Sequence, residues 1–135
     1  MKIEDQVISL EFAKRLKELG AKQDAYFCWE NTIGQTDQTC WRLTESWCVA
    51  EPIDLDMEYI SAFTVSELGE ILPHKINLNK QLHGFWVNKF IGNHIWSVGY
   101  GSVGIEFGDV TEANARAKLL IHLIESGIVA SEKLK

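Results

Sequence analysis

The chain has 135 residues, of which 46% are hydrophobic and 24% charged, and its net charge is −6. This length and composition predict a single folded domain over residues 1–135 and exclude a disordered chain. No apolar run approaches the roughly 20 residues that a membrane span needs, and the first residues lack the apolar core of a signal peptide. We therefore expect a cytoplasmic protein without a membrane partner.

The first predicted helix covers about residues 10–19. Phe12 and Leu16 lie on one face at helical spacing, and Ser9 precedes the helix as a candidate N-cap. Gly20 follows at the position where a left-handed residue commonly ends a helix.

Two segments rich in aromatic and β-branched residues come next, at residues 25–31 and 39–51. The polar and glycine-containing run 32–38 separates them. This arrangement predicts a β-hairpin.

Residues 53–59 alternate strictly between apolar and acidic side chains, which predicts a strand with one face in solvent. Asp54, Asp56 and Glu58 form the acidic side. They belong to the segment 43–74, which has seven acids and no Lys or Arg. Because an acidic surface repels a phosphate backbone, we expect no direct nucleic-acid binding. The three carboxylates are typical of a solvated strand face, and the alternative is that they bind a partner protein.

The middle predicted helix covers about residues 65–72. Thr64 and Glu67 have the spacing of a capping box, and Pro73 ends the helix. Each part of this segment has a local structural role. We therefore expect it to build the fold rather than to form a site.

Three further strands are predicted over about residues 84–91, 94–100 and 103–107, separated by Gly-Asn and Gly-Ser turns. A third helix begins after Thr111 as N-cap and ends in a Schellman motif at Gly127, with Ile128 folding back on the helix. Its spacing predicts a buried face formed by Ala113, Ala117, Leu120, Ile121 and Ile124.

The order of the predicted elements is helix, strands, helix, strands, helix. This order predicts an α+β domain with one antiparallel or mixed sheet of about four to six strands, packed with about three helices.

The sequence lacks the common catalytic and metal-binding patterns. Three cysteines and four histidines show no CxxC, HxxxH or HExxH spacing. The GxGxxG match at residues 99–104 precedes a strand pattern, whereas a dinucleotide fingerprint opens a helix. A calcium loop beginning at Asp54 would place Tyr59 where glycine is required. We predict no catalytic residue, no cofactor and no metal site.

Five tryptophans are many for this length, and all of them fall in predicted strands: Trp29, Trp41, Trp47, Trp86 and Trp96. Trp86 and Trp96 alternate out of phase with Phe85, Val87 and Ile95, which predicts that one of these two sets faces away from the helices. Indoles on a sheet can form the core, a protein interface or a ligand pocket. Trp86, Trp96 and Tyr100 are the candidate ligand-binding residues.

Residues 9–30, 61–73 and 111–129 together resemble a family of small uncharacterised proteins. Phages and prophage or mobile regions of bacterial genomes, often of Bacteroidales, encode this family. No activity, cofactor or catalytic residue is established for it. The resemblance implies an origin in phage DNA and the cytoplasm of a bacterial host.

The leading functional hypothesis is a non-enzymatic accessory domain that binds a host or phage protein. The first alternative is a module that binds a small aromatic or nucleotide-like ligand through the tryptophan- and glycine-rich strands. The second is an enzyme of unknown class.

Overall fold

The computed structural model describes residues 2–32, 41–45, 57–102 and 104–129. Helices and strands alternate in these residues as the sequence predicts, so the α+β class is confirmed. The elements in chain order are η1 Ile3–Asp5, α1 Leu10–Glu18, β1 Phe27–Thr32, β2 Arg42–Glu45, β3 Met57–Ala62, α2 Val65–Ile71, β4 Lys75–Leu78, β5 Gln81–Phe90, β6 Ile95–Tyr100, β7 Ile105–Asp109 and α3 Glu112–Glu125.

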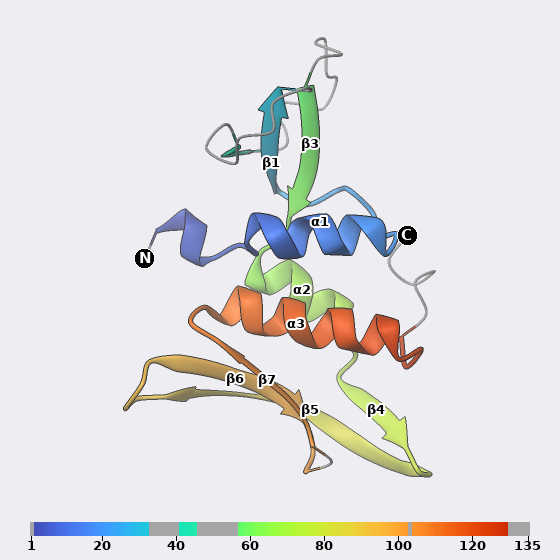
Figure 1. The fold of residues 1–135 in the computed structure, drawn as a ribbon. Helices are drawn as coiled ribbons and strands as arrows, with labels where there is room; N and C mark the ends of the chain where they lie inside the picture. Colours follow the sequence, from blue (N-terminus) through green and yellow to red (C-terminus); the bar gives the residue numbers. More distant parts are fainter. Residues whose placement is uncertain (1, 33–40, 46–56, 103, 130–135) are drawn as a thin grey trace.

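The described strands form two antiparallel sheets, with the orders β2-β1-β3 and β4-β5-β6-β7. The helices α1, α2 and α3 lie between them (Figure 1). The described strands therefore belong to two sheets, whereas the sequence predicts one. The helix α2 lies between β3 and β4 in the chain, and residues of both sheets, Ile60 and Val98, pack into the core of the helices. The fold is therefore a layer of three helices with one sheet on each side.

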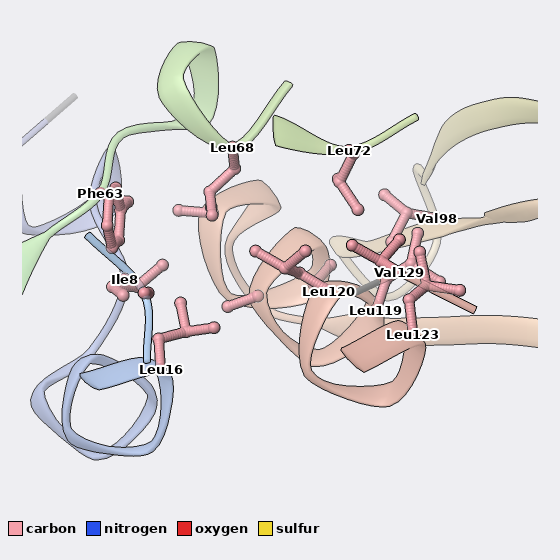
Figure 2. Close-up of a cluster of buried hydrophobic side chains, with 14 of the residues drawn as sticks. Ile8, Leu16, Phe63, Leu68, Leu72, Val98, Leu119, Leu120, Leu123 and Val129 are labelled. Carbon is pink, nitrogen blue, oxygen red and sulfur yellow. The ribbon is translucent and has the colours of Figure 1, made fainter. Parts of the chain in front are cut away.

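One hydrophobic core joins the three helices to both sheets. Figure 2 shows Leu16 of α1, Leu68 of α2 and Leu120 of α3 pointing toward one another, and all three are fully buried. Ile60 of β3 and Val98 of β6 belong to the same buried cluster. The core therefore fixes how the two sheets sit relative to the helices.

The buried face of α3 includes Ala113, Ala117 and Leu120 as predicted, but the rest of it differs from the prediction. Ile121 and Ile124 are only partly buried, whereas Ala115, Leu119 and Leu123 are fully buried. The helix packs against α1, α2 and the four-stranded sheet at the same time. Because it is covered from several directions, its buried arc is wider than the single stripe expected of a surface helix.

The predicted helix ends are largely confirmed. Thr64 Oγ1 accepts from the Glu67 backbone N–H at 3.2 Å, and the Thr64 N–H donates to Glu67 Oε1 at 3.0 Å, which completes the capping box. At the end of α3, Gly127 has a φ of +77° and its N–H donates to the Ile124 carbonyl at 3.1 Å.

One detail of the α3 terminus is corrected. The residue that closes back on Leu123 is Val129 rather than Ile128, since the Val129 N–H donates to the Leu123 carbonyl at 3.0 Å. Val129 is also the more buried of the two residues.

The predicted hairpin between β1 and β2 is confirmed by their antiparallel pairing. In the described residues β3 begins at Met57 and runs on to Ala62, past the predicted end at Tyr59. The strand β4 was not predicted. It pairs with β5 through the two-residue turn Asn79–Lys80, whose φ angles of 54° and 65° match the mirror-image turn that favours hairpins.

Candidate functional site

A pocket of about 510 Å³ lies where the four-stranded sheet extends past the helix layer. Its wall is made by η1, by the first residues of α2 and α3, and by facing residues of β5 and β6. Figure 1 shows η1, the starts of α2 and α3, and the turn that joins β5 to β6 on the same side of the molecule.

Lys89 and Trp96 form the sheet side of this pocket. They oppose each other across β5 and β6, so their side chains project from the same face. Lys89 Nζ lies 5.2 Å from the centroid of the Trp96 ring, within the range of a cation–π interaction. Trp96 is half-buried against the core, whereas Lys89 is exposed. The indole is therefore fixed, and the ammonium group remains accessible.

Backbone hydrogen bonds hold the opposite wall in place. The Val65 N–H donates to the Gln6 carbonyl at 3.2 Å, and the Ile8 N–H donates to the Phe63 carbonyl at 3.0 Å. These bonds attach the segment after η1 to the start of α2. Ser66, in the first turn of α2, adds an exposed hydroxyl to the pocket, so the segment that we expected only to build the fold also contributes to this wall.

The charges around the pocket are partly compensated. Arg116 Nε donates to Glu112 Oε2 at 2.8 Å, and both side chains are mostly buried. Lys89 and Asp5 also line the pocket, and no ion pair involves either of them within the described residues. The pocket therefore presents one accessible cation and one accessible anion.

The three candidate ligand residues do not come together. Trp96 lines the pocket, but Trp86 opposes Gly99 and projects from the other face of the sheet. Each even-numbered residue of β5 opposes an odd-numbered residue of β6. Trp86 and Trp96 therefore cannot share a face, although the alternation predicted within each strand is present.

Tyr100 is fully buried between the sheet and the helices. Its hydroxyl donates to the Pro73 carbonyl at 2.6 Å, and its ring makes an edge contact with Phe85. Burial raises the pKa of Tyr100 to about 12, and the positive charge of Arg116 opposes this shift. Its contacts are those of a core residue that joins β6 to the end of α2.

The remaining predicted residues lie elsewhere. Asp54, Asp56 and Trp47 fall outside the described residues, whereas Glu58 is exposed on β3. Binding of a partner by the acidic segment stays a prediction. Trp29 and Trp41 pack against the core.

Sequence reasoning missed Lys89 as a pocket residue. Lys89 follows Phe85 and Val87 at a spacing of two, which is the signal that it shares their face. The pocket could not be recognised from that signal, because its other wall comes from η1 and from the starts of two helices.

Comparisons with protein-family models, with curated proteins and with solved structures find no match to this chain. Among the described residues, no group of three His, Cys, Asp or Glu side chains could hold a metal ion. Nor is any helix in the described ranges long and apolar enough to cross a membrane. The function must therefore be inferred from the geometry of the pocket.

Proposed function

We propose that this domain is a non-enzymatic binding module for a small ligand that joins a flat apolar ring to an acidic group. The observation that supports this proposal is the pairing of Lys89 with Trp96 in a pocket of about 510 Å³. This volume lies within the range of small-molecule sites, which combine apolar walls with a few polar groups.

Each part of the ligand has a matching side chain. The ring stacks against the Trp96 indole, which the core holds in place. The acidic group pairs with Lys89 Nζ through charge-assisted hydrogen bonds. Glu112 does not oppose this binding, since Arg116 compensates its charge. Asp5 disfavours a second acidic group on the ligand.

A binding titration with two probes of the same shape tests the proposal. The probes are 2-naphthylacetate and its neutral amide, followed by the indole N–H signals in nuclear magnetic resonance spectra. We expect the acid to bind about twofold to fivefold more tightly than the amide, the range measured for exposed ion pairs. Addition of the acid should shift the indole N–H signal of Trp96.

Two variants make the test specific to the pocket. Lys89→Met removes the accessible cation and should abolish the preference for the acid. Lys75→Met makes the same change on β4, outside the pocket, and should leave the preference intact. The proposal is overturned if neither probe binds, or if Lys75→Met weakens acid binding as much as Lys89→Met does.

Binding of a host or phage protein and an origin in phage DNA stay predictions from the sequence. We also propose a cytoplasmic location.

A further inference from the structure

The face of the four-stranded sheet that points away from the helices, here called the outer face, has an indole and a carboxylate on the two sides of one strand. Trp86 of β5 and Glu106 of β7 both oppose Gly99 of the intervening strand β6. The two side chains therefore flank the same glycine from opposite sides. This arrangement is separate from the pocket, which lies on the other face.

Trp86 is held in one orientation on this face. Its Nε1 donates to the Gly101 carbonyl at 2.9 Å. A Cβ atom at Gly99 would lie only 2.9 Å from Trp86 Cζ2, so the indole packs directly over the glycine. The ring is half-buried and does not belong to the hydrophobic core. Part of it therefore remains accessible to a ligand.

Glu106 is also held in place, and its charge is not compensated. The hydroxyl of the buried Ser97 donates to Glu106 Oε1 at 2.7 Å, which directs the carboxylate over β6. Glu106 itself is exposed. No Lys, Arg or His in the described residues forms an ion pair with it. A negative charge beside an aromatic ring favours a cation at this point.

We propose that the outer face binds an arginine side chain of a partner protein, with the guanidinium group between Trp86 and Glu106. A guanidinium can stack on an indole while its N–H groups pair with a carboxylate, which an ammonium group does less well. Phe90, which is 46% exposed on the same face, adds apolar contact for residues next to the arginine.

A titration with short blocked peptides tests this proposal. One peptide contains arginine between two glycines, and the other contains citrulline, which has nearly the same shape without the charge. We expect the arginine peptide to move the Trp86 indole N–H signal and the citrulline peptide to leave it unchanged. Glu106→Gln, in which Ser97 keeps its acceptor, should weaken arginine-peptide binding by about twofold to fivefold.

Glu11→Gln is the matched control, since it removes the same charge from an exposed position on α1, outside the four-stranded sheet. It should leave peptide binding unchanged. The proposal is overturned if this control weakens binding as much as Glu106→Gln does, or if the citrulline peptide binds as tightly as the arginine peptide. It is also overturned if the arginine peptide shifts the indole N–H signal of Trp96 instead of that of Trp86. Absence of any shift at the solubility limit of the peptide also overturns it.

Discussion

The backbone N–H of Ser9 donates to Asn114 Oδ1 at 2.8 Å, which joins the start of α1 to the start of α3 across 105 positions of sequence. Ser9 is the N-cap of α1, as predicted, but its side chain forms no capping hydrogen bond. Asn114 also donates its backbone N–H to Thr111 Oγ1 at 3.2 Å. Asn114 thus forms hydrogen bonds at the starts of two helices, α1 and α3.

Replacement of Asn114 by alanine should destabilise the fold. The Ser9 N–H would lose its acceptor in a partly buried position, which costs about 1 to 3 kcal/mol in the free energy of unfolding. Asn114→Asp keeps an acceptor in the same place and adds a negative charge near the start of α3, which the helix dipole favours. Urea unfolding should therefore show a clearly lower free energy of unfolding for Asn114→Ala and little or no change for Asn114→Asp. Equal losses in both variants would contradict the role of this hydrogen bond.

Tyr100 should make stability fall at high pH. Its pKa is about 12 in the folded protein, above the ordinary value of about 10 for the unfolded chain. The neutral phenol is therefore favoured by folding. Its contribution is complete below pH 10 and is lost as the pH rises through 12, by roughly 2 to 3 kcal/mol in total. Unfolding measured from pH 8 upward checks this dependence.

Tyr100→Phe is the control for that experiment. It should cost about 1 to 3 kcal/mol at neutral pH, because the Pro73 carbonyl loses the phenol donor. Tyr100→Phe should also reduce the fall in the free energy of unfolding above pH 10. A decline as steep as in the unmodified protein would mean that other groups cause it.

Gly99 should tolerate no side chain. A Cβ atom there would clash with the Ile105 carbonyl oxygen of the neighbouring strand and with the Trp86 ring. We expect Gly99→Ala to lower the free energy of unfolding by about 1 to 3 kcal/mol, as overpacking does, and to displace the Trp86 indole. Gly84→Ala is the matched control, since no atom lies within 4 Å of the added carbon. Thermal unfolding of the two variants should differ clearly, and similar melting temperatures would refute the clash.

The helix ends were predictable because they depend on residues close in sequence. The capping box of Thr64 and Glu67 and the left-handed Gly127 involve partners three or four positions away. The class of the fold follows from the order of such elements. Alternation within β5 and within β6 was predictable for the same local reason.

The division into two sheets, the faces occupied by Trp86 and Trp96, and the pocket were decided only by the tertiary structure. The turn between β5 and β6 sets the register, and that register puts Trp86 opposite Gly99 and Trp96 opposite Lys89. A shift of one residue would have placed Trp86 and Trp96 on the same face without changing any local pattern. The pocket forms only where η1, the starts of α2 and α3, and the strands β5 and β6 come together. The shared hydrophobic core holds these elements in place, because burial of its apolar side chains from water stabilises the fold.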